Sequence, residues 1–268
     1  MLNFVNDSDR YVFRKYYRSG LRSHIFEVLT VQDVQTETCG RIMDGIRMFP
    51  RARPKKMFRI LRNRFESVEA VFHEIEKYHM LLDFFGPKYI AESEEFIVEY
   101  TGTGTSQIVL CGLQEYIEGV ILDPWRLFGK DYLRELFRPA TTSDLQLQTL
   151  LEKAQMNIAG FIRKSRHMIS DTGYIPDLAG VGNLILTPAG DLKLVDINNI
   201  VKIKFNDSIL IDDKGYPSCD VSIEVLSILE QDILGKDIPD DDPLYRLFLS
   251  PERKIKVKAL EKKFYTNL

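Results

Sequence analysis

The sequence has 268 residues, 44% of them hydrophobic, enough for one large domain or two compact lobes. Its 36 Lys and Arg and 39 Asp and Glu leave a net charge of −3, so any basic patch must be local. The first residues lack the basic and apolar regions of a signal peptide, and no apolar run approaches the roughly 18 residues of a membrane span. We therefore expect a cytoplasmic protein with no membrane span, and no nucleic acid as a partner.

The cysteines and histidines indicate neither a disulfide framework nor a metal site. Cys39, Cys111 and Cys219 lie far apart and lack zinc-ligand spacing, which is typical of a reducing compartment. The four histidines also lack ligand spacing, so we assign no metal to them.

The first part of the chain, residues 1–116, reads as mixed strand and helix. Apolar residues at helical spacing predict one helix, which ends at the stop signal Gly86-Pro87, and alternating runs predict strands. The expected elements are a strand at Lys55–Leu61, a helix at Glu66–Phe85, and a hairpin of Glu94–Tyr100 and Gln107–Ile117 joined by Thr101–Ser106.

The second part, residues 117–268, reads as mostly helical with one small hairpin. We expect helices at Asp123–Phe137, at Ser143–Ile169 with Ser143 as N-cap, and from near Ser222. Two short strands, Leu184–Thr187 and Leu192–Val195, are joined by Pro188-Ala189-Gly190, which suits a type I turn. The predicted fold class is therefore α+β, with a small strand-rich part followed by a helical part.

The hairpin brings an amide and a carboxylate to its open end, opposite the turn. Asn183 immediately precedes its first strand and Asp196 immediately follows its second. Mg²⁺ prefers oxygen ligands and keeps water and substrate phosphates in its shell, so one carboxylate and one amide suffice. Asp177 lies just upstream, close enough to orient an attacking hydroxyl. Each residue alone is also explained as a turn or capping residue; the joint pattern favours a site.

The stretch "NLILTPAGDLKLVDIN" resembles the protein-kinase-like superfamily, which includes atypical kinases and aminoglycoside-phosphotransferase-like proteins. The resemblance implies a two-lobed fold, ATP and Mg²⁺ as cofactors, Asn183 and Asp196 as metal ligands about 4 to 6 Å apart, and Asp177 as catalytic base. It covers residues 55–230 and is strongest over residues 175–198.

Other positions follow the same order. The resemblance implies that the backbone of Glu115, Tyr116 and Ile117 forms the hinge that meets adenine, although a buried strand end explains them equally well. Glu74 then lies on the regulatory helix and pairs with a basic side chain from Lys55–Arg59. Asp220 would buttress the catalytic loop, or serve as a simple N-cap.

The departures from the family pattern are specific. The loop from Asp177 to Asn183 is one residue longer, and Gly180 and Gly182 would allow the bulge. Ile175-Pro176 replaces the family's His-Arg, so control through a phosphorylated activation loop is not expected. The segment after Asp196 is short, which implies a trimmed substrate-binding region.

The part of the chain expected to bind the nucleotide phosphates lacks the family signature, because no glycine-rich loop is found near the N-terminus. Arg59 or Lys56 could take the lysine's role, and Lys56 is favoured because an ammonium suits the family's geometry. The run from Arg47 to Arg64 has eight Lys and Arg and no acid. It reads as a solvated edge, a phosphate-binding wall, or a patch for nucleic acid or an acidic partner.

Two functional hypotheses follow from these patterns. The first is an ATP- and Mg²⁺-dependent phosphotransferase acting on a hydroxyl of an unknown protein or small molecule. The second is a pseudokinase that binds nucleotide or acts as a scaffold. The trio of Asp177, Asn183 and Asp196 favours the enzyme, and the missing glycine loop favours the pseudokinase.

Overall fold

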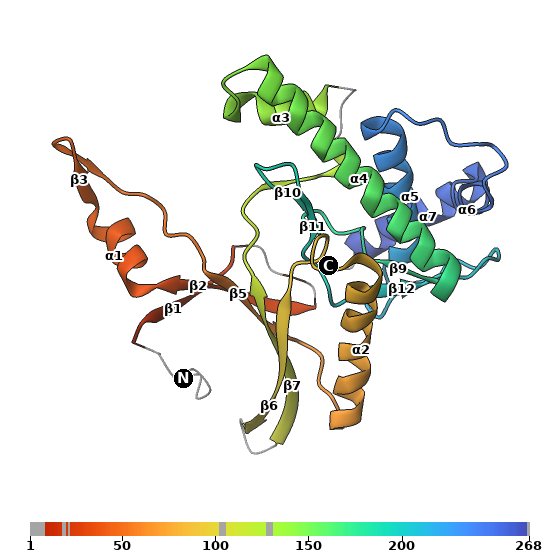
Figure 1. The fold of residues 1–268 in the computed structure, drawn as a ribbon. Coiled ribbons are helices and arrows are strands. Elements are labelled where there is room, and N and C mark those ends of the chain that lie inside the picture. The colour runs from red at the N-terminus through yellow and green to blue at the C-terminus, as the bar shows by residue number, and fades with distance from the viewer. Residues whose placement is uncertain (1–8, 18–19, 21, 102–105, 127–130, 267–268) are drawn as a thin grey trace. The chain divides into compact units, whose positions relative to one another are not determined.

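The computed structural model describes residues 9–17, 20, 22–101, 106–126 and 131–266 (Figure 1). The chain forms two compact units. Unit 1 is Met1–Glu76 with Ala91–Tyr116, and unit 2 is Lys77–Ile90 with Ile117–Leu268. The chain enters unit 2 after Tyr116, but Lys77–Ile90 also belongs to unit 2 rather than to the N-terminal part. The elements are mixed α and β, as the sequence predicts.

Unit 1 is built on a five-stranded antiparallel sheet with the order β1-β2-β5-β7-β6. The strands are rich in β-branched and aromatic residues that alternate across the sheet, a pattern that favours strands. Their bounds are β1 Tyr11–Lys15, β2 Ser23–Thr30, β5 Lys56–Leu61, β6 Ser93–Thr101 and β7 Ser106–Glu115.

Helix α2 (Val68–Phe85) contributes its first half to unit 1. Val71 packs with Leu61 and Leu110 in a small core, so α2 covers the sheet face that carries these residues. Because side chains alternate along a strand, Met57 and Arg59 share that face with Leu61. Phe58 lies on the opposite face, in a second core with Val28 and Cys111.

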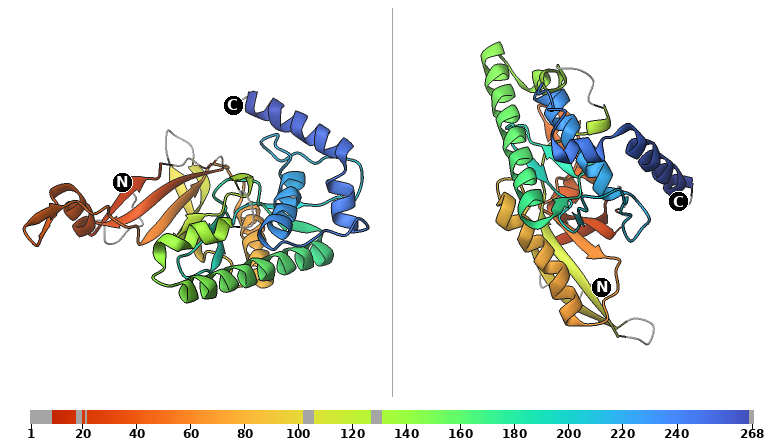
Figure 2. Two further views of the ribbon diagram at one scale, coloured as in Figure 1. Left: turned by 90° about the horizontal axis from the view of Figure 1, so that it is seen from above. Right: turned by 90° about the vertical axis from the view of Figure 1, so that its right-hand side faces the viewer.

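A helix and a hairpin are inserted between β2 and β5. Helix α1 (Val31–Cys39) is capped by Thr30, whose hydroxyl accepts from the Asp33 N–H at 3.1 Å. Strands β3 (Arg41–Met43) and β4 (Ile46–Met48) are joined by Asp44-Gly45, with φ of 49° and 78°. Two positive φ values fit a type I′ turn, for which Asp-Gly is well suited. The insertion extends beyond the end of the sheet (Figures 1 and 2).

Unit 2 is mostly helical. Its longest helix, α4 (Asp144–Thr172), begins at Ser143, whose side chain accepts from the Gln146 N–H, and ends at Gly173 in the left-handed conformation. The other helical segments are η1 Pro124–Arg126, α3 Tyr132–Phe137, η2 Arg138–Ala140, α5 Ser218–Ile228, a π-helical turn η3 at Leu229–Ile233, α6 Pro243–Phe248 and α7 Pro251–Thr266.

Short antiparallel ladders complete unit 2. Strand β10 pairs with β11 and β8, and β12 pairs with β9. Their bounds are β8 Val120–Ile121, β9 Tyr174–Pro176, β10 Leu184–Leu186, β11 Leu192–Leu194 and β12 Ile200–Lys202.

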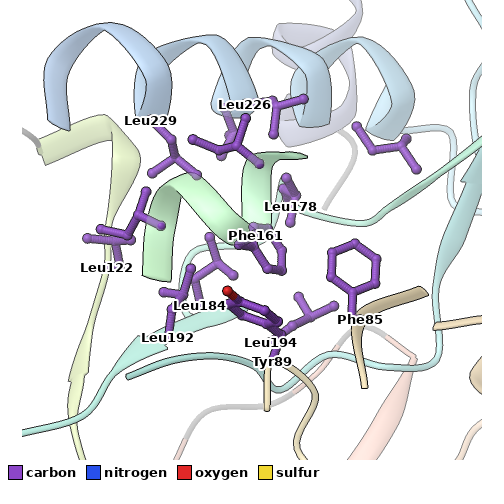
Figure 3. Close-up of a cluster of buried hydrophobic side chains, with 14 of the residues drawn as sticks. Phe85, Tyr89, Leu122, Phe161, Leu178, Leu184, Leu192, Leu194, Leu226 and Leu229 are labelled. Carbon is purple, nitrogen blue, oxygen red and sulfur yellow. The ribbon is translucent and has the colours of Figure 1, made fainter. Parts of the chain in front are cut away.

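The main core of unit 2 contains side chains from these ladders and from the helices that pack on them (Figure 3). Phe161 of α4 is fully buried and packs 5.0 Å from Phe85 and 6.0 Å from Tyr89, measured between ring centroids. Leu178 and Leu184, which flank the loop after β9, join the same core. The loop that carries the predicted site is therefore anchored at both ends by buried apolar side chains.

The sequence predicts the stronger elements to within a few residues. It predicts β5, α2, β6, β7, α4, β10 and β11 correctly, and the Thr187 carbonyl accepts from the Gly190 N–H as a four-residue turn requires. The hairpin connection Gly102–Thr105 and the middle of the expected helix Asp123–Phe137 lie outside the described residues. Helix α5 begins at Ser218, earlier than expected, because the chain turns into the helix directly after Pro217.

No helix of the described part of the chain is long and apolar enough to cross a membrane.

Candidate functional site

Two short ladders bring the predicted acid and amide residues of unit 2 together. The β10–β11 hairpin pairs Leu184 with Leu194, and the Val195 N–H donates to the Asn183 carbonyl at 2.8 Å. The β9–β12 ladder pairs Pro176 with Ile200, so Asp177 and Asn199 are the next residues in register. The loops 177–183 and 195–199 therefore connect the same ends of both ladders.

Asp177 is held by its backbone and by its carboxylate. Its N–H donates to the Asn199 carbonyl at 3.0 Å. Its Oδ1 accepts from the Ala179 N–H at 2.9 Å, and its Oδ2 accepts from the Asn199 amide. The residue is 6% exposed. These hydrogen bonds fix the direction of the carboxylate.

Asn183 is oriented by the carbonyl of Asp177. Its Nδ2 donates to that carbonyl at 2.9 Å, and since a carbonyl only accepts, the amide oxygen must face the other way. Gly180 allows this packing, because a Cβ there would lie 2.6 Å from the Asn183 Oδ1. Gly182 serves the loop differently, through a φ of 101° that favours glycine.

Asp196 is the second residue after β11 and is half-buried. Its Oδ1 accepts from the Asn198 N–H at 3.5 Å, a weak contact. Its neighbour Val195 is bonded to Asn183, so the Asp196 and Asn183 backbones lie side by side. The predicted 4 to 6 Å separation of their oxygens stays a prediction.

Helix α5 supports the loop through a residue that the sequence did not single out. The Ser222 hydroxyl accepts from the Leu178 N–H at 3.0 Å, and Leu178 is 2% exposed. Ser222 is fully buried, so this hydrogen bond forms in a dry environment. It fixes the residue next to Asp177.

Asp220, which the sequence suggested as the buttress or as an N-cap, has a different partner. It lies in the first turn of α5, after the N-cap residue Pro217. Its carboxylate forms a buried ion pair with Arg253 of α7, whose Nη2 lies 3.2 Å from Oδ2. Arg253 also donates to the carbonyls of Asn206 and Ser208. The ion pair thus links α5 to α7, and Arg253 also links α7 to residues 206–208.

In unit 1, Arg59 forms an ion pair within the sheet. Its Nη2 lies 2.7 Å from the Glu95 Oε1 and 3.1 Å from the Ser93 hydroxyl, and both charged side chains are about 5% exposed. Arg59 and Glu95 lie on either side of Gly112 in register. A Cβ at Gly112 would be 2.5 Å from Glu95 and 2.8 Å from Arg59, so only glycine leaves room for the pair.

The side chains of Lys56 and Arg59 lie on opposite faces of the sheet. Lys56 shares the face of Phe58, whereas α2 covers the face of Leu61 and Arg59. The half-buried Glu74 belongs to α2, which lies on the Arg59 side of the sheet. Its expected pairing with a basic side chain from Lys55–Arg59, and the preference for Lys56 as the phosphate-binding cation, stay predictions.

The three predicted hinge residues span the change from one unit to the other. Glu115 and Tyr116 end unit 1, and Ile117 begins the second stretch of unit 2. The Glu115 N–H donates to the Glu92 carbonyl at 2.8 Å, and its carboxylate accepts from the Glu92 N–H. The sheet therefore already uses the Glu115 N–H, while Tyr116 is 36% exposed.

The donor set of the unit 2 loops fits a small oxygen-preferring cation rather than a transition metal. Within the described ranges, no three His, Cys, Asp or Glu side chains gather in a group that could hold a metal ion. Asn183 and Asp196 offer one amide and one carboxylate oxygen, a set that leaves most of the shell to water and phosphate, as Mg²⁺ tolerates.

Sequence reasoning missed Asn199 and Ser222. Asn199 lies only three residues after Asp196, and the double asparagine was a visible signal. Its role depends on the three-residue strands β9 and β12, which are too short to stand out as a period-2 pattern.

Comparison with known proteins adds no family assignment. No protein-family model matches the sequence, and a search of curated proteins finds no match.

Proposed function

We propose that the protein is an ATP- and Mg²⁺-dependent phosphotransferase that transfers the γ-phosphoryl group to a hydroxyl of a protein or small-molecule acceptor. The observation that carries this proposal is the joined loop pair of unit 2. Asp177 is fixed by Asn199, and Asn183 is fixed by Asp177. Asp196 follows Val195, whose N–H donates a hydrogen bond to the Asn183 carbonyl. Phosphoryl transfer depends mainly on such positioning and on charge neutralisation.

Asn183 and Asp196 would hold the metal. The Asn183 Oδ1 is turned away from the Asp177 carbonyl, and the Asp196 carboxylate accepts a long, weak hydrogen bond from the Asn198 N–H. When bound, Mg²⁺ would neutralise the charge of the nucleotide phosphates.

Asp177 would serve as the base that orients the acceptor hydroxyl. Two hydrogen bonds hold its carboxylate in a fixed direction, as a group that accepts the hydroxyl proton requires. Because the surrounding bonds are made before any acceptor arrives, the carboxylate is preorganised for its task.

In this proposal, unit 1 is the strand-rich lobe and unit 2 the helical lobe of a protein-kinase-like fold. Ile175-Pro176 precedes Asp177, which argues against control through a phosphorylated activation loop. The nucleotide contacts expected from Lys56, Glu74 and the hinge residues belong to the proposal as well. Arg59 is the weakest of these candidates, because Glu95 already neutralises it.

The proposal is tested by two substitutions that separate binding from turnover. Asp196→Ala should remove the Mg²⁺-dependent thermal shift caused by ATP. Asp177→Asn should keep that shift and lower phosphoryl transfer by about 10²- to 10⁴-fold, since general base catalysis acts only in the transition state. Thermal-shift titrations and an assay of ATP turnover measure the two effects.

A matched control is Asp191→Asn. Asp191 lies at the other end of the same hairpin and pairs with Lys153 at the surface, so this change should alter neither nucleotide binding nor turnover. If wild-type protein shows no thermal shift with millimolar ATP and Mg²⁺, the phosphotransferase proposal fails.

The second candidate is a pseudokinase that binds nucleotide or acts as a scaffold. The buried pairing of Arg59 with Glu95 favours it, because a cation expected near the phosphates is part of the sheet instead. A pseudokinase would show ATP binding without turnover, and Asp177→Asn would then change nothing.

A further inference from the structure

The insertion between β2 and β5 is ordered but has no core of its own. From Val31 to Phe49, not one residue is buried, although the segment forms α1 and the β3–β4 hairpin. A nine-residue helix and an isolated two-stranded hairpin are each marginal in water. The insertion therefore offers apolar surface that nothing in the described chain covers.

The exposed apolar side chains concentrate at the hairpin. Five of the twenty large apolar residues that are exposed in the described part of the chain fall within eight positions: Ile42 65%, Met43 44%, Ile46 67%, Met48 48% and Phe49 60%. Scattered single exposures are normal, whereas a cluster of this kind marks an interaction site.

These side chains occupy both faces of the hairpin. Met43 lies opposite Ile46, and Met48 lies opposite Arg41, so one face carries three apolar side chains. Ile42 lies opposite Arg47 on the other face, where Phe49 packs beside Gly40. A flat protein partner would cover only one face. A medium that surrounds the hairpin would cover both.

The charge of the chain is divided between this region and the rest. The segment Arg41–Lys55 contains five of the 36 Lys and Arg and one of the 39 Asp and Glu, so it carries +4 and the remaining chain −7. Arg41, Arg47, Arg51, Arg53 and Lys55 are all exposed. Arg51 contacts Glu27 and Lys55 contacts Asp33, whereas the segment Arg41–Lys55 itself has a net charge of +4.

We propose that the β3–β4 hairpin and the basic segment behind it bind the surface of an anionic lipid membrane. The hairpin places Ile42, Met43, Ile46, Met48 and Phe49 at the boundary between headgroups and acyl chains, and the basic residues contact the anionic headgroups. Two hairpins of a symmetric dimer would bring like charges together, which disfavours a second copy as the occupant. The membrane surface supplies both an enclosing apolar medium and negative charge.

Asp44 is a residue whose replacement should strengthen membrane binding. It lies in the turn at the tip of the hairpin, next to Gly45, where it would approach the anionic headgroups first. Its carboxylate should oppose binding, so Asp44→Asn should strengthen binding to anionic vesicles. Asn also tolerates the positive φ of 49° at this position.

The test is cosedimentation of the full chain with vesicles of phosphatidylcholine alone or with about 30% phosphatidylserine. Binding is expected with phosphatidylserine, and it should weaken about tenfold or more when salt rises from about 0.1 to about 0.5 M. Ile46→Asp should weaken binding by at least about tenfold, because it replaces a lipid-facing side chain with an anion.

The matched control is Ile255→Asp. Ile255 is 72% exposed on α7 of unit 2, so the substitution replaces a similarly exposed isoleucine outside the hairpin. Binding should change by no more than about twofold or threefold, the effect of one added negative charge. Circular dichroism and thermal unfolding verify that the variants are folded, which is expected because neither residue is buried.

Several results would overturn the proposal. One is the absence of binding to the phosphatidylserine vesicles at low salt. Another is equal binding of wild type and Ile46→Asp, and a third is weaker binding of Asp44→Asn. Sedimentation velocity tests whether a second copy of the chain binds the hairpin instead. A wild-type dimer that dissociates in Ile46→Asp would show this and would overturn the proposal.

Discussion

The site loops of unit 2 and strand β5 of unit 1 hold their charged groups by opposite means. Asp177 accepts hydrogen bonds from a backbone N–H and from the amide of Asn199, neither of which carries a charge. Arg59 forms an ion pair with the carboxylate of Glu95, so its charge is compensated within the sheet. The two regions thus show two ways of positioning a charged side chain: neutral donors orient it, whereas a buried counter-ion makes it part of the fold.

Removal of Arg59 should have the largest effect on stability. Arg59→Met leaves the Glu95 carboxylate buried without this partner, and the free energy of unfolding should fall by about 3–5 kcal/mol in urea denaturation. The double variant Arg59→Met with Glu95→Met should recover most of the loss, since it removes both charges.

Arg62→Met is the control for that variant. Arg62 is exposed just after β5, so its loss should change the free energy of unfolding by no more than about 0.5 kcal/mol. If Arg59→Met were equally mild and instead abolished ATP binding, Arg59 would be a phosphate ligand and the contrast between the two regions would disappear.

A methyl group at Gly180 should have a smaller effect on stability and a clear effect on the site. In Gly180→Ala the added Cβ meets the Asn183 Oδ1 at 2.6 Å, so the amide must shift. We expect a loss of about 1–3 kcal/mol in the free energy of unfolding and a weaker Mg²⁺-dependent ATP shift.

Val181→Ala is the neighbouring control, because Val181 is 54% exposed and should tolerate the change within about 0.5 kcal/mol. Retention of the full Mg²⁺-dependent shift in Gly180→Ala would remove Asn183 from the list of metal ligands.

The cysteines probe each unit separately, and the effect of their ionisation on stability is absent at neutral pH and emerges only in alkaline solution. Burial raises the pKa of Cys111 in unit 1 to about 11 and that of Cys219 in unit 2 to about 12. Both values are above the ordinary thiol pKa of about 9, so the folded state keeps protons that the unfolded state loses. The stabilisation is present below pH 9 and declines as pH rises towards the two folded pKa values, by at most about 1.4 kcal/mol per pH unit for each thiol.

Thiol labelling measures the same contrast at neutral pH. Cys39 is exposed and should react first with a disulfide reagent, while Cys111 and Cys219 should react only when their units open. Mass spectrometry of the labelled peptides assigns each rate to its cysteine. Fast native labelling of Cys111 or Cys219 would contradict the burial on which the alkaline prediction depends.

The sequence predicts the site where the chain folds locally and misses it where strands from distant segments meet. The β10–β11 hairpin closes through a turn of four residues, so the relation of Asn183 to Asp196 follows from a pattern within one short stretch. The contact between Asp177 and Asn199 requires the β9–β12 ladder, whose strands are only three residues long. The loop that carries Asp177 was thus visible in the sequence, but its partner Asn199 was not.

The arrangement of charged residues in unit 1 also depends on contacts between distant segments. Alternation along β5 separates Lys56 from Arg59, but the sequence gives no indication of which face α2 covers. The pairing of Arg59 with Glu95 passes over Gly112 of the intervening strand and depends on the order of three strands. In unit 2, the ion pair of Asp220 with Arg253 likewise depends on where α7 lies, which the sequence pattern does not indicate.

The discontinuity of unit 2 has a consequence for biosynthesis. The sheet of unit 1 is complete once β7 has left the ribosome, and folding during synthesis proceeds from the N-terminal side. Lys77–Ile90 is synthesised before β6 and β7 but belongs to unit 2, where the Tyr89 carbonyl accepts from the Leu194 N–H at 2.7 Å. Such distant contacts slow folding, so this early segment must wait for much of the later chain. The nascent protein therefore acquires its sheet and its exposed hairpin well before it acquires the loops around Asp177.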